Sequence, residues 1–322
     1  MNKTLLVTGG TGSFGNSVVK KFLKSKNFSE IRIFSRDESK QDRMAKDYNN
    51  SKLSFFLGDI RDEERMFKVC RGVDVIFHAA ALKQVPSCEN ATWETIKTNI
   101  IGSRNVIEAA ISNKVKNLTM LSTDKSVYPI NTMGMTKALM EKLALSVDFP
   151  GKTNINCVRY GNVLYTRGSV IPLFVNQIFK KKDLTITEPN MTRFLMKIED
   201  SLDLAVKTTQ LKSSGNVFVK KSPAAKIINV ANVLLKIFNS KSKIKIVGRR
   251  PGEKAYETLI TREEMIKTKS FSGYYVINGK HIKNKTNKTY PEYDSNSTKQ
   301  LNNEELKKLI LSLPEIQQAL NH

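Results

Sequence analysis

The alternation of short apolar runs with helical patterns over residues 1–165 most constrains what this chain can fold into. The apolar runs are rich in β-branched and aromatic residues, and amphipathic stretches such as GNSVVKKFLKS separate them. They read KTLLVTG, EIRIFS, LSFFLGD, VDVIFHAA, NLTMLST and NINCVRYGNV. Strands that alternate with helices form a parallel sheet that is covered on both faces. The pattern therefore predicts an α/β fold built on a doubly wound parallel sheet.

The later part of the chain has shorter and more mixed elements. We expect residues 166–270 to form a smaller substrate-binding lobe over the mouth of the sheet, where ligands of such folds bind. Some of the later elements are expected to return to the first domain, residues 1–165. Residues 271–322 are interpreted as an extension that ends in a helix from about Asn303 to Leu313.

Within this extension, residues 271–298 are polar and aperiodic, and the segment is too long for an ordinary connection. Its aromatic residues are Phe271, Tyr274, Tyr275, Tyr290 and Tyr293. Aromatic side chains often anchor interfaces, so one interpretation is a latch that holds a homo-oligomer together. The other interpretation, a solvated loop, stays open.

The formal net charge of +23 raises the question of nucleic-acid binding. Lysines are scattered, the longest basic run is residues 180–182, and aromatic residues do not interleave with it, so we expect no nucleic-acid partner. The three cysteines and three histidines match no metal or disulfide spacing, which predicts no metal site. No signal peptide and no apolar stretch of bilayer length is present, so we expect a cytoplasmic protein without membrane insertion.

A glycine-rich turn, VTGGTGSFG, follows the first predicted strand and opens the first predicted helix. Gly9, Gly12 and Gly15 have the spacing that allows a tight turn and lets a backbone approach a pyrophosphate at a helix N-terminus. With Thr11, Ser13 and Phe14, they form the predicted cradle of a dinucleotide.

The end of the second strand bears on the choice of cofactor. An NAD ribose calls for a carboxylate there, but this chain has Ser35 and Arg36, with Lys40 one turn later. Cations suit a 2′-phosphate, which favours NADP. Asp37 and Glu38 keep open the alternative that these are solvated charges at a helix start.

Two further strand ends are expected to border the cofactor. After the third strand, Asp59 and Ile60 would lie beside the adenine. After the fourth, small side chains let the cofactor pass and a lysine reaches into the cleft; these residues are Ala79, Ala80, Ala81 and Lys83.

Together these motifs resemble a known family. They include TGGTGSFG, AAALKQVP, TNIIGSRNVIEAA, STDK, MGMTK, RYGNV, GSVIPLF, MTRF and RPGEK. The chain resembles an extended short-chain dehydrogenase/reductase of the polysaccharide-biosynthesis type, with a Rossmann domain that binds NADP. Within that type it is most similar to the capsule-type 5-inverting UDP-N-acetylglucosamine 4,6-dehydratases. The resemblance covers nearly the whole chain and implies a UDP-sugar substrate.

The resemblance implies that Asp124 and Lys125 are a proton-transfer pair. Oxidation at carbon 4 acidifies the carbon 5 proton, a base removes that proton, and an acid protonates the leaving hydroxyl at carbon 6. Asp124 suits the acid and Lys125 the base if burial raises the pKa of the first and lowers the pKa of the second. A surface ion pair between neighbours is the plain alternative.

Lys137 follows Met133 by four residues, so both project from one face of a helix that begins near Asn131. The resemblance implies that Lys137 contacts the nicotinamide ribose, with Asn99 also near the cofactor, and that Met133 replaces the tyrosine of other relatives. The acceptor of the carbon 4 hydroxyl proton stays open between Thr123, Lys137 and a water.

The resemblance also implies substrate contacts, and arginine suits a diphosphate because its planar fork gives paired hydrogen bonds. The residues are Lys83, Asn162, Ser169, Val170, Thr192, Arg193, Arg250 and Glu253. The expected activity is elimination of water from UDP-N-acetylglucosamine with inversion at carbon 5. Two alternatives stay open: a UDP-sugar 4-epimerase and a catalytically silent NADP-binding protein.

Overall fold

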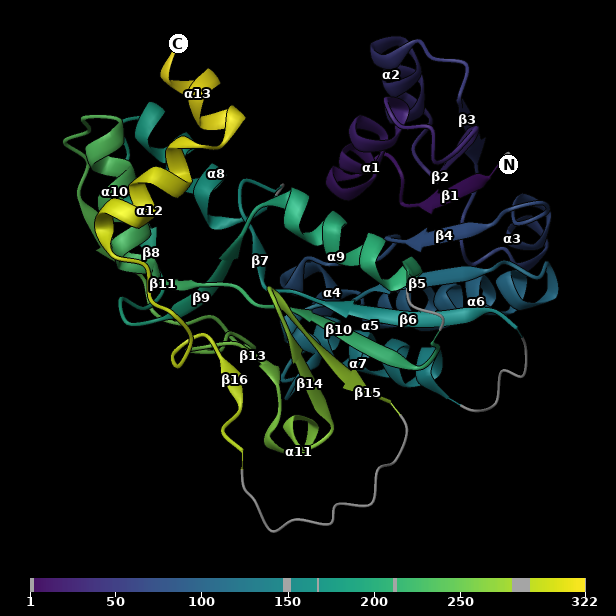
Figure 1. Ribbon diagram of the computed structural model, residues 1–322. Coiled ribbons are helices and arrows are strands. Elements are labelled where there is room, and N and C mark those ends of the chain that lie inside the picture. Colours follow the sequence, from purple (N-terminus) through teal and green to yellow (C-terminus); the bar gives the residue numbers. More distant parts are fainter. Residues whose placement is uncertain (1–2, 147–151, 167, 211–212, 280–289, 322) are drawn as a thin grey trace.

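A central sheet organises the computed structural model, which describes residues 3–146, 152–166, 168–210, 213–279 and 290–321. Within these residues the sheet has nine strands in the order β14-β15-β10-β6-β5-β4-β1-β2-β3 (Figure 1). Their bounds are β1 Thr4–Thr8, β2 Glu30–Ser35, β3 Leu53–Leu57, β4 Val75–His78, β5 Asn117–Leu121, β6 Asn154–Arg159, β10 Asn216–Lys220, β14 Thr268–Phe271 and β15 Tyr274–Asn278. Strands β10, β6, β5, β4, β1, β2 and β3 pair parallel with their neighbours in this order. At the edge next to β10, β15 pairs antiparallel with β10 and β14 pairs antiparallel with β15. The predicted doubly wound parallel sheet is confirmed.

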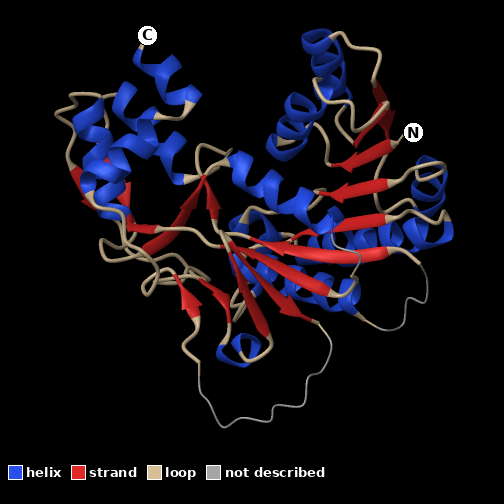
Figure 2. Ribbon diagram, in the orientation of Figure 1, coloured by secondary structure: helices blue, strands red, loops and turns tan. Residues whose placement is uncertain are grey.

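Helices cover both faces of this sheet (Figure 2). On one face lie α1 (Ser13–Leu23), α2 (Glu38–Tyr48) and α9 (Ile198–Gln210), and on the other lie α3 (Glu63–Val69), α6 (Gly102–Ser112) and α7 (Thr132–Leu145). In β1, Leu5 and Val7 enter the core of the first face and Leu6 that of the second. Burial on both sides explains why the strand sequences are continuously apolar.

A second lobe has its own apolar core. It is built from β7 (Asn162–Val163), β8 (Leu184–Ile186), β9 (Thr192–Met196), β11 (Ala224–Lys226), β12 (Ile244–Ile246), α8 (Val170–Phe179), α10 (Ile227–Ile237), α12 (Asn303–Leu311) and α13 (Pro314–Leu320). Of the elements between residues 166 and 270, α9 packs on the central sheet and β10 joins it between β6 and β15.

Short elements connect these bodies. Between β4 and α6 lie α4 (Val85–Asn90), α5 (Thr92–Ile96) and a π-helix, η1 (Lys97–Ile101). A 3₁₀ turn, η2 (Asp124–Ser126), follows β5, and α11 (Arg262–Met265) follows β13 (Thr258–Ile260), which pairs with β16 (Tyr293–Asp294). Since β13 packs beside η2, a distant part of the chain reaches the end of β5.

The prediction of an aperiodic segment over residues 271–298 is wrong for its first part. Strands β14 and β15 form a hairpin whose second strand pairs with β10, and the Phe271 and Tyr274 rings stack with centroids 5.0 Å apart. Residues 280–289 lie outside the described residues, so the oligomer latch stays a prediction. The expected C-terminal helix is confirmed as α12, which ends at Leu311.

In the described part of the chain, no helix is long and apolar enough to cross a membrane. Over the same residues, no group of His, Cys, Asp and Glu side chains is arranged to hold a metal ion.

Candidate active site

A cleft of about 810 Å³ opens at the carboxyl ends of β1, β4, β5 and β6. The residues that follow these strands, Gly9, Ala79, Ser122 and Tyr160, all line it. This is the position at which a parallel doubly wound sheet binds its ligands. The predicted site residues in its lining are Gly9, Thr11, Gly12, Ser13, Phe14, Ser35, Arg36, Lys40, Ile60, Ala79, Ala80, Ala81, Lys83, Thr123, Asp124, Lys125, Met133, Lys137, Asn162 and Ser169. Outside the described lining are Gly15, Asp59, Asn99, Val170, Thr192, Arg193, Arg250 and Glu253.

The glycine turn forms one end of the cleft. Gly9 has a φ of +66°, and a Cβ there would lie 2.8 Å from the backbone of Ala80. A Cβ on Gly15 would lie 1.8 Å from the carbonyl oxygen of Gly10, so helix α1 can pack on the turn only with glycine at this position. No side chain caps α1, whose N-cap is Gly12. Its first backbone N–H groups are therefore available for a phosphate.

The next part of the cleft wall carries the cations expected at the adenosine end. Arg36 is half exposed, and its Nη1 lies 3.4 Å from Asp59 Oδ2. Lys40 forms an ion pair with Asp37, the N-cap of α2. Both cations line the cleft, each beside a carboxylate. The wall thus offers positive charge without leaving these two side chains unpaired.

Asn99 acts behind the wall. Its side chain accepts a hydrogen bond from Leu82 N at 2.8 Å and donates to Leu82 O at 2.9 Å. These bonds fix the backbone next to Lys83, whose side chain lines the cleft and whose pKa is lowered by burial. Asn99 therefore shapes the site without entering the described lining.

The η2 turn brings Thr123, Asp124 and Lys125 to the cleft wall. The carboxylate of Asp124 is buried, and its Oδ1 accepts hydrogen bonds from Thr123 Oγ1 at 2.8 Å and from Lys125 Nζ at 3.0 Å. The Lys125 Nζ lies 3.3 Å from Glu257 Oε1 on its other side. One ammonium group is therefore flanked by two buried carboxylates.

This arrangement changes the expected electrostatics of Lys125. Burial by itself lowers the pKa of Lys125, but the negative charges of Asp124 and Glu257 outweigh burial and raise that pKa above its ordinary value. The condition that burial lowers the Lys125 pKa is therefore not met, because the charge of the adjacent Asp124 opposes burial and Glu257, which the sequence did not place here, adds to it. The nearby Lys254 has a pKa lowered by burial and donates from Nζ to Val127 O at 2.5 Å.

Met133 and Lys137 lie on α7, and Asn131 caps this helix as expected by accepting from Gly134 N at 2.8 Å. Both side chains are buried and line the cleft. Lys137 Nζ donates to Leu121 O at 2.7 Å, and burial lowers its pKa to about 8. The floor of the cleft is therefore a methionine beside an amine.

The predicted substrate residues divide into two groups. Asn162 Oδ1 and Ser169 Oγ are buried at the cleft without a hydrogen-bond partner among the described residues, so both are available to a ligand. Arg193, in contrast, donates to the carbonyl oxygens of Thr192 and Lys254, each at 2.8 Å. The guanidinium group of Arg193 is thus hydrogen-bonded to the backbone, and Arg193 is not among the described residues that line the cleft.

The other members of that second group are also held outside the cleft. Thr192 Oγ1 lies 2.8 Å from Ser295 Oγ, and Glu253 Oε1 accepts from Thr187 Oγ1 at 3.2 Å. Arg250 is exposed, and Val170 begins helix α8. The structure does not bring these residues to the η2 turn.

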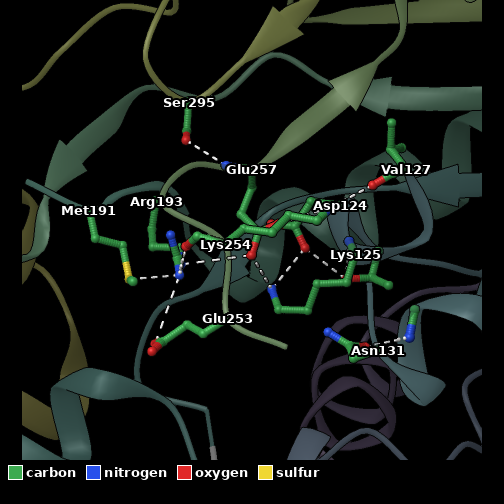
Figure 3. Close-up of polar contacts among 12 residues, drawn as sticks. Asp124, Lys125, Val127, Asn131, Met191, Arg193, Glu253, Lys254, Glu257 and Ser295 are labelled. Carbon is green, nitrogen blue, oxygen red and sulfur yellow. Dashed lines mark hydrogen bonds and ion pairs between the residues drawn. The ribbon is translucent and has the colours of Figure 1, made fainter. Parts of the chain in front are cut away.

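Several residues near the site were not predicted. Gln84, Ser122, Tyr160 and Thr166 line the cleft, and the strand-end rule could have indicated Ser122 and Tyr160. Glu257 and Lys254 lie beside Asp124 and Lys125 (Figure 3). Lys254 ends the RPGEK motif, but no local signal in the sequence pointed to Glu257 or to the contact of either residue with η2, because that contact depends on the tertiary fold.

The sequence of this chain is similar to those of known proteins. A family model described as polysaccharide biosynthesis protein matches residues 5–279. The chain is similar to a UDP-glucose 4-epimerase from Rickettsia felis, with 49% identity over 338 aligned positions that cover 100% of this chain and 99% of that protein.

Solved structures show the same architecture. Pen from Bacillus thuringiensis has 33% sequence identity and a TM-score of 0.89, covering 99% of this chain and 98% of that one. The dTDP-glucose 4,6-dehydratase DesIV from Streptomyces venezuelae, solved with NAD, has 20% identity and a TM-score of 0.72, covering 78% of this chain and 86% of that one. The likeness to DesIV shows the shared fold.

Proposed function

Because the chain belongs to the polysaccharide biosynthesis protein family, we propose that it is a nucleotide-sugar 4,6-dehydratase that acts on UDP-N-acetylglucosamine and inverts carbon 5. The observation that carries the proposal is the contact between Asp124 and Lys125 at the cleft wall, with a 3.0 Å separation between carboxylate and amine. Elimination across carbons 5 and 6 needs an acid and a base side by side. A 4-epimerase needs neither at those carbons.

The proposed cofactor is NADP, which when bound supplies hydride transfer from carbon 4 and back to carbon 6. The turn at Gly9 and the uncapped N-terminus of α1 fit its pyrophosphate. Arg36 and Lys40 would hold a 2′-phosphate, and Lys137 would contact the nicotinamide ribose. Two relatives support a nicotinamide cofactor and a sugar-nucleotide substrate. DesIV was solved with NAD, and the Rickettsia protein is named for UDP-glucose.

The protons can be followed through this chain's own residues. Lys125 Nζ takes the carbon 5 proton as that C–H bond breaks, and Asp124 protonates the carbon 6 hydroxyl, which leaves as water. When hydride has returned to carbon 6, a proton from solvent adds to the opposite face of carbon 5, which inverts that carbon. The elimination requires neutral Lys125 and protonated Asp124. Transfer of one proton from Nζ to Oδ1 along their 3.0 Å hydrogen bond would produce both forms at once. This transfer has to work against the two carboxylates, which raise the pKa of Lys125.

The second candidate function is a UDP-sugar 4-epimerase, which the name of the Rickettsia relative favours. Such an enzyme returns hydride to carbon 4 and leaves the hydroxyl on carbon 6. A silent NADP-binding protein would bind both ligands without turnover. The Asp124–Lys125 pair favours the dehydratase over both, because a carboxylate that is 1% exposed is costly to bury and here it contacts an amine at the cleft wall.

Proton NMR of the protein with NADP and UDP-N-acetylglucosamine in D₂O tests the proposal. We expect a 4-keto-6-deoxy sugar with deuterium at carbon 5. Lys125→Ala should abolish carbon 5 exchange, and Asp124→Asn should slow loss of the carbon 6 hydroxyl about 100-fold.

Lys142→Ala, which removes an exposed lysine of α7, is the matched control and should behave like the unmodified protein. Formation of the carbon 4 epimer alone, from this substrate or from UDP-glucose, would establish the epimerase. Binding of both ligands without any product would establish the silent protein.

A further inference from the structure

Glu257 is a buried carboxylate to which the proposed reaction gives no role. It immediately precedes β13, its side chain is 3% exposed, and its backbone N–H donates to Ser295 Oγ at 2.9 Å. This bond fixes the peptide unit from which the carboxylate projects. The side chain therefore enters the neighbourhood of η2 from a rigid support, 132 residues along the chain from Lys125.

The carboxylate of Glu257 points at the amine of Lys125 (Figure 3). Oε1 lies 3.3 Å from Lys125 Nζ and 3.8 Å from Arg193 Nε. Oε2 lies 3.9 Å from Lys254 Nζ and has no hydrogen-bond partner among the described residues. A buried carboxylate with one unsatisfied oxygen is costly, so its retention calls for a reason beyond packing.

The two carboxylates differ in their relation to the cleft. Asp124 and Lys125 line it, whereas Glu257 is not among the described lining residues. Lys125 is 24% exposed and lies between the two carboxylates. Glu257 thus restricts the position of the Lys125 Nζ, although the Glu257 side chain does not line the cleft where a substrate would bind.

We infer that Glu257 is a positioning residue for the elimination: its carboxylate holds the Lys125 amine beside Asp124 and sets the pH range in which carbon 5 loses its proton. The inference rests on the proposed dehydratase function. The charged groups that face Lys125 are Asp124 on η2, Glu257 before β13, and Arg193 on β9. Lys254 faces the same two carboxylates from the segment before β13.

The charge balance gives the direction of the effect. Removing the negative charge of Glu257 leaves Lys125 with one adjacent carboxylate and the positive charge of Arg193. Lys125 would then lose its proton at lower pH. Loss of the contact would also free Nζ to leave Asp124, which lowers the maximal rate.

The first measurement is carbon 5 proton exchange in the holoenzyme as a function of pH, followed by NMR in D₂O. The acid limb is the pH range in which the exchange rate falls as the pH is lowered, and the plateau is the maximal rate. For Glu257→Gln we expect the acid limb to move about one pH unit or more toward low pH and the plateau to fall about 10-fold. Glu257→Asp keeps the charge and should leave the limb near its original position. An acid limb that stays in place in Glu257→Gln would overturn the inference, whatever happens to the plateau.

Glu264→Gln is the matched control. Glu264 is another largely buried carboxylate, on α11, and it pairs with Arg159 at 2.8 Å. This variant should lower thermal stability without moving the acid limb. If it moves the limb as far as Glu257→Gln does, any lost carboxylate has the same effect and the positioning role is refuted.

The second measurement does not depend on turnover. The ¹³Cε resonance of Lys125, assigned by its absence in Lys125→Arg, reports the titration of the amine in the full chain. Glu257→Gln should lower the pKa of Lys125, and an unchanged titration would refute the role of Glu257. If the unmodified protein shows no carbon 5 exchange, the proposed function fails, and this titration still decides whether Glu257 controls Lys125.

Discussion

Met133 lines the cleft at the position where the sequence resemblance places a tyrosine in other relatives. A thioether accepts no proton from a sugar hydroxyl, so the proposed oxidation at carbon 4 needs another acceptor. Thr123 Oγ1 already donates to Asp124, and Lys137 has a pKa of about 8, close enough to neutrality to supply free amine. Both side chains line the same cleft.

We therefore expect Met133→Leu to keep dehydratase activity within a few-fold, since leucine preserves an apolar floor of similar volume. Lys137→Ala should lose about 100-fold or more, because it removes both an amine and the predicted ribose contact. Product NMR at saturating NADP measures both variants. Met135→Leu on the exposed face of α7 is the control. Equal losses in Met133→Leu and Lys137→Ala would contradict this assignment.

The sequence could indicate Asp124, Lys125, Met133 and Lys137 because all four lie within one strand–turn–helix unit. Strand-end position and helical spacing are local properties that a sequence displays. Glu257 could not be predicted, because only the folded chain brings the start of β13 to η2. Arg193 shows the converse: its motif suggested a diphosphate contact, but its guanidinium donates to backbone carbonyls.

At the scale of elements, His78 ends strand β4 inside the core. Its Nδ1 lies 2.7 Å from Thr8 Oγ1 on β1, and its Nε2 lies 3.0 Å from Ser103 Oγ on α6. Burial lowers the pKa of His78 from 6.5 to about 3. The ring is therefore neutral in the folded protein at every pH where the fold is expected to be stable.

This burial predicts a pH dependence of stability. Below pH 6.5 the unfolded chain binds a proton at His78 that the folded chain does not, so the free energy of unfolding falls as the pH falls. The residue should contribute a slope of about 1.4 kcal/mol per pH unit down toward its folded pKa. Urea unfolding of the unmodified protein and His78→Gln between pH 7 and 5 measures this slope. Equal slopes in the two proteins would show that His78 does not carry it.

The elements themselves were predictable to different degrees. Strands β1, β4, β5 and β6 are buried along almost their whole length, which gives the continuous apolar runs that identified them. The hairpin of β14 and β15 escaped prediction because most of β14 is exposed at the sheet edge and its sequence, TKSF, is largely polar. Edge strands carry a weaker pattern than central ones because only part of their surface is buried.

At the scale of the whole molecule, the cleft is bordered by the ends of the central strands and by Tyr160, Asn162, Thr166 and Ser169, which lead into the second lobe. A ligand along this cleft contacts both bodies in the folded state and neither in the unfolded chain. The chain also carries a net charge of +23, and anionic ligands reduce the self-repulsion of a compact basic protein. Binding should therefore stabilise the molecule as one unit.

We expect NADP at 100 times its Kd to add about 2.7 kcal/mol to the free energy of unfolding and to raise the Tm by roughly 4 °C. Equal concentrations of NAD should give a smaller shift, because Arg36 and Lys40 favour a 2′-phosphate. Calorimetry of the unmodified protein and Arg36→Ala measures both cofactors, with Lys26→Ala, an exposed lysine outside the described lining, as control. Arg36→Ala should lose the difference between the cofactors while keeping the shift that UDP-N-acetylglucosamine produces. A larger shift with NAD, or an unchanged preference in Arg36→Ala, would exclude NADP recognition at this end of the cleft.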